Sequence, residues 1–156
     1  MPHRPYASWG ARVGAYLLDG VITFGVVIIP VVIGLIIVFK DAEWNDATDE
    51  IIESSINWGG FGLVALGGLA GMAFTIWNRG IRVGVHGQSL GKKIVGIEVV
   101  SAESGQYLGA GMGFLRMILD SILGNACFLN YLWPLWDEQH QTWHDMIVKS
   151  IVLTKP

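Results

Sequence analysis

The feature that most constrains this chain is an uncharged apolar run of 20 residues, Gly20–Phe39. A helix of that length spans about 30 Å, the thickness of the hydrocarbon core of a bilayer. A helix that begins earlier, near Trp9, would also contain Arg12 and Asp19. No A-x-A-like cleavage site follows the run, so we interpret it as an uncleaved anchor rather than a signal peptide.

A second uncharged run covers Ser54–Asn78, and Trp58 and Trp77 bracket it. Their separation of 19 residues corresponds to about 28 Å on a helix, which fits the two interfacial belts where tryptophan is enriched. Only 15% of the residues are charged, against about 25% in a typical soluble domain. The two runs therefore predict an integral membrane protein rather than a soluble domain with buried core helices.

The third hydrophobic element, residues 107–136, is interrupted by Arg116 and Asp120. Its uncharged part, Ser121–Trp136, has 16 residues and contains Pro134. This pattern fits either one tilted helix or two short helices that turn back inside the bilayer. Broken helices at membrane depth are tolerated where protein covers them.

The loops predict the orientation. Lys40 is the one basic residue of loop 40–53 against six acidic residues, whereas segment 79–106 carries four basic residues against two acidic ones. The positive-inside rule then places the N-terminus and segment 79–106 in the cytoplasm. We predict a single multi-pass domain, 1–156, with spans at about 10–39 and 56–78, an acidic outer loop 40–53, a cytoplasmic segment 79–106, the third element at about 107–136 and a cytoplasmic tail 137–156.

Two short segments, Ile94–Val100 and Ile147–Leu153, have the composition of β-strands. If they pair as a small cytoplasmic ribbon, both lie on one side, and the third element must return to the side where it began. The predicted fold is therefore all-α membrane, with two full transmembrane helices, a third broken or returning helical element and a small cytoplasmic β-ribbon.

Three blocks of sequence belong together. Residues 6–19 (YASWGARVGAYLLD) place an arginine and an aspartate seven residues apart, 87–97 (GQSLGKKIVGI) follow the second run, and 143–146 (WHDM) precede the last strand. Over nearly its whole length the chain resembles the RDD family of small, mostly bacterial membrane proteins, named for one arginine and two aspartates. The resemblance places these three at Arg12, Asp19 and Asp145, although Met146 and Lys149-Ser150 depart from the usual pattern. It implies a membrane fold in a bacterial inner (plasma) membrane and a loose association with transport.

Ionisable residues inside a membrane need partners, because an unpaired charge there costs several kcal/mol. Asp19 therefore either belongs to a buried polar network, for instance with Arg116, or is a proton or cation site. Arg12 can snorkel to the interface. Arg116 and Asp120 are four residues apart and are expected to form an intramembrane ion pair.

Small and basic residues suggest two kinds of contact. Gly67, Gly68 and Gly71 form a dense cluster that lets helices approach closely, either within the chain or against a partner. Lys92 and Lys93 are expected at the anionic lipid surface, where each contributes about 1 kcal/mol.

Several chemistries find no support in the sequence. Segment 87–93 lacks the spacing and the Ser or Thr of a phosphate-binding loop, so no nucleotide site is predicted. His140 and His144 have no convincing third ligand, and the single Cys127 has no partner, so we predict no metal and no other cofactor. Neither a catalytic constellation nor a basic patch with interleaved aromatics stands out, which argues against an enzyme and against nucleic-acid binding.

These observations favour a non-enzymatic accessory or interaction subunit of a larger membrane assembly, such as a transport complex. Its expected partners are membrane lipids and other integral membrane subunits. The alternative is a cation/proton antiporter that uses Asp19, which would have to be oligomeric because two or three spans are too few to enclose a pathway.

Overall fold

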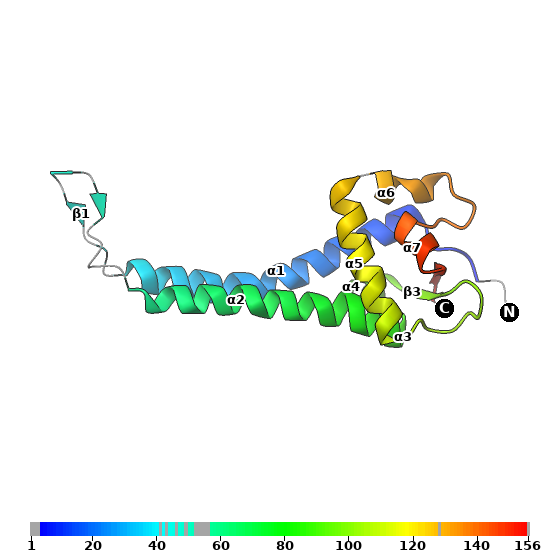
Figure 1. Ribbon diagram of the computed structural model, residues 1–156, viewed down its shortest axis with the longest axis horizontal. Coiled ribbons are helices and arrows are strands. Elements are labelled where there is room, and N and C mark those ends of the chain that lie inside the picture. The colour runs from blue at the N-terminus through cyan, green and yellow to red at the C-terminus, as the bar shows by residue number, and fades with distance from the viewer. Residues whose placement is uncertain are drawn as a thin grey trace. The chain divides into compact units, whose positions relative to one another are not determined.

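The computed structural model describes residues 4–40, 42, 44–45, 47–48, 50–51, 57–127 and 129–155. The elements follow in the order α1 (Trp9–Phe39), β1 (Trp44–Asn45), β2 (Glu50–Ile51), α2 (Gly59–Thr75), η2 (Ile76–Ile81), α3 (Arg82–His86), α4 (Leu90–Val95), β3 (Ile97–Ser101), α5 (Ala110–Ala126), α6 (Leu129–Leu132), η3 (Trp133–Leu135), α7 (Trp143–Ile147) and β4 (Ser150–Thr154) (Figure 1). They form two compact units, which we call unit 1 (Met1–Val21 with Thr75–Pro156) and unit 2 (Ile22–Phe74).

Two helical stretches are long and apolar enough to cross a membrane: Trp9–Phe39, and Gly59–His86, which joins α2, η2 and α3 without a break. Pro30 lies inside α1 without ending it. A third stretch is the bent pair Ala110–Gly124 and Leu129–Leu135, whose two helices are inclined at 116°. It meets the same criterion only if its two helices are counted together. The apolar runs of the sequence therefore correspond to helices of membrane-spanning length.

Unit 2 is built on close packing between the later part of α1 and α2. Gly60, Gly67 and Gly71 are the buried residues of α2. A Cβ added at Gly67 would lie 2.9 Å from Cγ of Pro30. A Cβ at Gly71 would overlap the side chain of Val27. Gly67 and Gly71 therefore pack within the chain, whereas the space around Gly68 is open.

This packing predicts that alanine destabilises the protein at one of two adjacent glycines and not at the other. We expect Gly67→Ala to lower the free energy of unfolding by about 1–3 kcal/mol, because the new methyl group is forced against Pro30. We expect Gly68→Ala to be neutral or slightly stabilising, since alanine is the better helix former and nothing obstructs it. Denaturant unfolding of the two purified variants in detergent measures the difference. Equal effects would contradict the observed packing.

Unit 2 also contains the short strands β1 and β2, of two residues each. β1 and β2 are antiparallel, with Trp44 opposite Ile51. Residues 41, 43, 46, 49 and 52–53 of the predicted acidic loop 40–53 lie outside the described residues.

The predicted pairing of the last two strand segments is confirmed. β3 and β4 are antiparallel, in a register that sets Val99 opposite Val152. Both strands begin about three residues later than predicted, because Ile94 and Val95 end helix α4 and Ile147 ends helix α7. Helix α4 begins at its N-cap Ser89 and ends at Gly96, whose φ of 77° is left-handed and favours glycine.

The N-terminal segment extends this sheet on the other side of β4. Tyr6 forms an antiparallel bridge with Leu153, the amide of Ala7 donates to the carbonyl of Val152 (2.9 Å), and the amide of Thr154 donates to that of Pro5 (3.0 Å). Residues near the two ends of the described chain therefore lie side by side (Figure 1). The buried core beneath them consists of Ala7, Ala15, Val83, Ile97, Val99 and Val152.

Candidate functional site

Asp19 is buried on α1 and binds segment 88–91 to that helix through hydrogen bonds. Its carboxylate accepts hydrogen bonds from Oγ of Ser89 (2.5 Å), the amide of Gly91 (2.8 Å) and Nδ2 of Asn78 (2.8 Å). Both oxygens of the carboxylate therefore have hydrogen-bond donors from the chain. A Cβ at Gly91 would overlap the carbonyl oxygen of Ala15. The Gly-Gln-Ser-Leu-Gly block thus supplies a hydroxyl, an amide and a residue small enough for close contact with α1.

A π-helical turn presents Asn78 to Asp19. In η2 the amide of Arg82 donates to the carbonyl of Trp77, five residues earlier, which defines the wider turn. Asn78 is fully buried and uses both ends of its side-chain amide, since Nδ2 donates to Asp19 and Oδ1 accepts from the amide of Leu90 (2.8 Å). Such turns are common at functional sites, and this one completes the Asp19 cluster.

Asp145 is the centre of a second buried network. Its Oδ2 lies 2.8 Å from Nη1 of Arg12, and its Oδ1 lies 2.8 Å from Nε and 2.7 Å from Nη2 of Arg116. Ser150 and Thr142 donate their hydroxyls to the same carboxylate, each at 2.9 Å. These side chains come from α1, α5, β4 and the start of α7, so one carboxylate joins both ends of the chain.

The electrostatics of this network favour the charged form of Asp145. Burial alone would raise the pKa of its carboxyl, but the charges of Arg116 and Arg12 outweigh burial and hold the pKa well below its usual value. The resemblance placed the family residues at Arg12, Asp19 and Asp145. The structure joins the first and the last in an ion pair and puts Asp19 in the separate cluster with Ser89.

The pair expected between Arg116 and Asp120 is not what the structure shows. Arg116 turns its guanidinium to Asp145, where it forms two contacts with one carboxylate oxygen. Asp120 instead has Nδ1 of His144 3.5 Å from its Oδ1. A fully buried carboxylate that already accepts hydroxyl donors offers Arg116 a better-organised partner than a neighbour on its own helix. Arg116 is likewise not the partner of Asp19.

His144 is buried within the Asp145 network. Its Nε2 lies 2.9 Å from Oγ1 of Thr142, and its Nδ1 lies 3.3 Å from Nδ2 of Asn130. Burial, followed by the charge of Arg116, lowers the pKa of His144 to about 4. The histidine is therefore neutral in the folded protein at physiological pH.

This lowered pKa predicts loss of stability in mild acid. The unfolded chain takes up a proton on His144 near pH 6.5, whereas the folded chain resists it until about pH 4. The free energy of unfolding should fall by roughly 3 kcal/mol as the pH drops through that interval. Unfolding in detergent at a series of pH values measures the slope, which His144→Gln should flatten and His140→Gln should not. An unchanged slope in His144→Gln would contradict the assignment.

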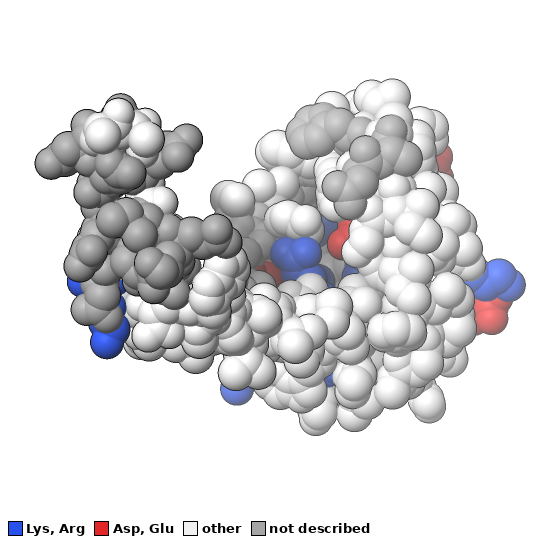
Figure 2. All heavy atoms as spheres, turned by 60° about the vertical axis from the view of Figure 1, so that its left-hand side comes forward, with Lys and Arg blue, Asp and Glu red and all other residues white. Residues whose placement is uncertain are grey.

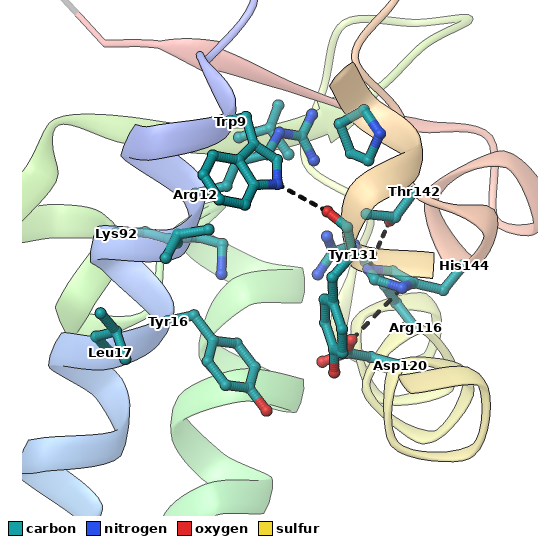
Figure 3. A pocket seen from close by; sticks show the side chains of 13 residues that line it. Trp9, Arg12, Tyr16, Leu17, Lys92, Arg116, Asp120, Tyr131, Thr142 and His144 are labelled. Atoms are coloured by element: carbon teal, nitrogen blue, oxygen red, sulfur yellow. Dashed lines mark hydrogen bonds and ion pairs between the residues drawn. The ribbon is translucent and has the colours of Figure 1, made fainter. Parts of the chain in front are cut away.

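A cavity of about 340 Å³ opens in unit 1 beside these networks. Its apolar and aromatic walls are Trp9, Val13, Tyr16, Leu17, Tyr131 and Pro134. Figure 3 shows Lys92 and Tyr16 on one side of it, and Tyr131, Asp120 and His144 on the other. Figure 2 shows basic and acidic atoms recessed among uncharged ones near the middle of one face. The cavity thus combines an apolar wall with several buried charges.

The two adjacent lysines have different surroundings. Both were expected at the lipid surface, but only Lys93 is exposed, whereas Lys92 is half-buried and lines the cavity. Burial and the charge of Arg116 are the main causes that lower the pKa of Lys92, to about 8. The helical turn of α4 separates the two side chains, because neighbours on a helix point in different directions.

Within the described residues, no group of three His, Cys, Asp or Glu side chains gathers as a metal site. His140 uses Nδ1 for a contact with the carbonyl of Pro134 (2.8 Å), and His144 is held by Thr142 and Asn130. Asn78, Ser89, Asn130 and Thr142 belong to the two networks but were not singled out by sequence reasoning. One available signal was Thr142 with Asp145 three residues later, a capping-box spacing that the structure contains.

The fold and site define a mostly helical protein with two helices of membrane-spanning length. Its unit 1 contains buried ion pairs from Arg12 and Arg116 to Asp145. The family model of the RDD family matches residues 6–149. The chain belongs to the RDD family, as the sequence blocks indicated.

Two curated relatives are similar over nearly the whole chain. The proline-rich antigen of Mycobacterium leprae (strain TN) is 30% identical over 162 residues, which cover 98% of this chain and 63% of that protein. The proline-rich antigen homolog of Mycobacterium tuberculosis (strain ATCC 25618 / H37Rv) is 32% identical over 165 residues, with 97% and 64% covered. The chain thus spans less than two thirds of the length of these relatives. No solved structure gives a significant match.

Proposed function

We propose that this chain is a non-enzymatic accessory subunit that docks against other integral membrane subunits of a larger assembly, such as a transport complex. The observation that carries the proposal is the face of α2 opposite its buried glycines. Gly62, Ala65 and Ala73 are exposed there, as are the larger side chains of Leu69 and Met72. Small residues on a membrane helix let a second helix approach closely.

The exposed side of α1 in the same unit has a different character. Phe24 and Ile29 are each 63% exposed, and Val32 and Ile36 are exposed beside them. Bulky aliphatic and aromatic side chains suit contact with lipid tails, which are as apolar as these residues. Although α2 also exposes Leu66, Leu69 and Met72, its exposed small residues favour it as the docking helix.

The buried polar groups support a structural role rather than ion exchange. Asp19 accepts three hydrogen bonds from the chain itself, and Asp145 is held by Arg12 and Arg116. No observation around Asp19 favours the antiporter alternative.

The proposed topology follows the charge of the loops. It places the N-terminus, segment 79–106 and tail 137–156 on the cytoplasmic side of a bacterial inner membrane, together with the β3–β4 pair. The bent pair α5 and α6–η3 then forms the returning third element. Cysteine labelling in membrane vesicles tests this arrangement. Labelling of residues 41–53 only from the cytoplasmic side would invert it, and labelling of residue 155 only from outside would replace the returning element with a third span.

Identification of the proteins that co-purify with this chain tests the docking proposal. After purification in mild detergent from native expression, we expect a complex of defined stoichiometry with other membrane proteins. Gly62→Leu and Ala65→Leu should weaken the complex, whereas Gly25→Leu on α1, where space for a side chain is also open, should not. A lone monomer or homodimer, unaffected by all three changes, would contradict the proposal. Gly67→Leu is unsuited to this test because Gly67 packs against α1.

A further inference from the structure

Two cationic side chains that line the unit 1 cavity have N–H groups without a hydrogen-bond acceptor in the part of the chain that the structure describes. Nε and Nη2 of Arg12 are buried without a hydrogen-bond partner among the described residues, although Nη1 binds Asp145. Within the same residues, Nζ of Lys92 forms no hydrogen bond and no ion pair. Unpaired charged donors in a buried site are unfavourable, so an acceptor in the cavity would relieve both side chains.

Both positive and negative side chains lie around the cavity. Arg12, Lys92 and Arg116 face Asp120 and Asp145, and the neutral His144 adds no charge. Outside the cavity wall, Asp19 and Arg79 also act on Lys92 with opposite signs. These three cations and two carboxylates therefore sum to a net charge of +1, while Asp137, outside the lining, also acts on Arg12 with a negative charge.

The apolar wall reaches the exposed surface of α1. Tyr16 and Leu17 line the cavity and are 43% and 62% exposed. Trp9 and Tyr131 meet over it, where Nε1 of the tryptophan donates to the carbonyl of Tyr131 (2.9 Å). Tryptophan and tyrosine are typical of the depth at which lipid headgroups lie. A ligand with an anionic head and an apolar tail fits such a lining.

We propose that this cavity binds a phosphate oxyanion, with Arg12 and Lys92 as its donors, and that an anionic phospholipid headgroup is the source. A soluble phosphate ester has the same recognisable chemistry and is distinguished by the experiment below. A bound anion would also offset the burial that lowers the pKa of Lys92. This binding does not depend on the proposed docking face of α2.

Native mass spectrometry of the full chain in detergent tests the proposal with three probes: a phosphatidylglycerol, the diacylglycerol with the same acyl chains, and glycerol 1-phosphate. We expect a one-to-one adduct with phosphatidylglycerol. Lys92→Gln should weaken it by about tenfold or more, as expected for loss of a charged donor that lines the cavity. Lys93→Gln removes the same charge from the adjacent exposed position and should change the affinity by less than about twofold.

Each outcome decides between the readings. Binding of glycerol 1-phosphate with the same dependence on Lys92, without a phospholipid adduct, supports the oxyanion site and assigns a soluble source. Diacylglycerol binding as well as phosphatidylglycerol would overturn the proposal. Equal weakening by Lys92→Gln and Lys93→Gln would also overturn it and indicate attraction by surface charge. Lys92→Arg, which keeps the charge, should retain binding, and thermal unfolding of each variant shows that it is folded.

Discussion

We expect Asp145→Asn to lower the free energy of unfolding by about 3–5 kcal/mol, the usual consequence of removing one member of a buried ion pair. The substitution leaves Arg12 and Arg116 buried without a counter-charge, and it weakens the acceptor of the Ser150 and Thr142 hydroxyls. Equilibrium unfolding in detergent, followed by circular dichroism, measures the loss.

A surface ion pair in the same unit provides the control. Glu103 and Lys149 are 2.7 Å apart, but their side chains are 68% and 70% exposed. Glu103→Gln removes one carboxylate charge, as Asp145→Asn does, and should leave the free energy of unfolding nearly unchanged because solvent screens the pair. Similar losses in the two variants would contradict the structural role of Asp145.

Gly91→Ala should have the second-largest effect, a loss of about 3 kcal/mol from overpacking. The added Cβ would overlap the carbonyl oxygen of Ala15 and lie 2.9 Å from Cγ of Asp19, so α4 would have to move away from α1. That movement would also lengthen the hydrogen bond from the Gly91 amide to Asp19. Thermal unfolding reports the loss, and protease sensitivity of segment 88–91 reports the movement.

Gly111→Ala is the matched control for this change. Gly111 lies in α5 with nothing within 4 Å of an added Cβ, so alanine should be neutral or slightly stabilising there. If Gly91→Ala proved as well tolerated as Gly111→Ala, the close contact between α4 and α1 would be wrong.

The helical elements were predictable because their signal is local and strong. Long uncharged runs such as Gly20–Phe39 require a spanning helix or a buried one, and both predict helix. The pairing of β3 with β4 was also predictable from β-branched composition. Their starts were not, because Ile94 and Val95 have strand propensity but follow a capped helix that only Gly96 ends.

The partners of the buried charges were less accessible to sequence reasoning. The four-residue spacing of Arg116 and Asp120 predicted a local pair, but a carboxylate 29 positions away along the chain takes that arginine. Such long-range contacts depend on how α5 and α7 pack, which no local spacing encodes. Lys92 and Lys93 look alike in sequence, and only the orientation of α4 assigns one of them to the cavity.

The central claim is that Arg12 and Asp145, from opposite ends of the chain, act as one structural pair. A double-mutant cycle with Arg12→Gln, Asp145→Asn and the combined variant measures this most directly, as the free energy of unfolding in detergent. We predict a coupling energy of about 2 kcal/mol or more, because the second substitution removes a charge that the first has already left unpaired. Single effects that add within about 0.5 kcal/mol would show independent sites and contradict the claim.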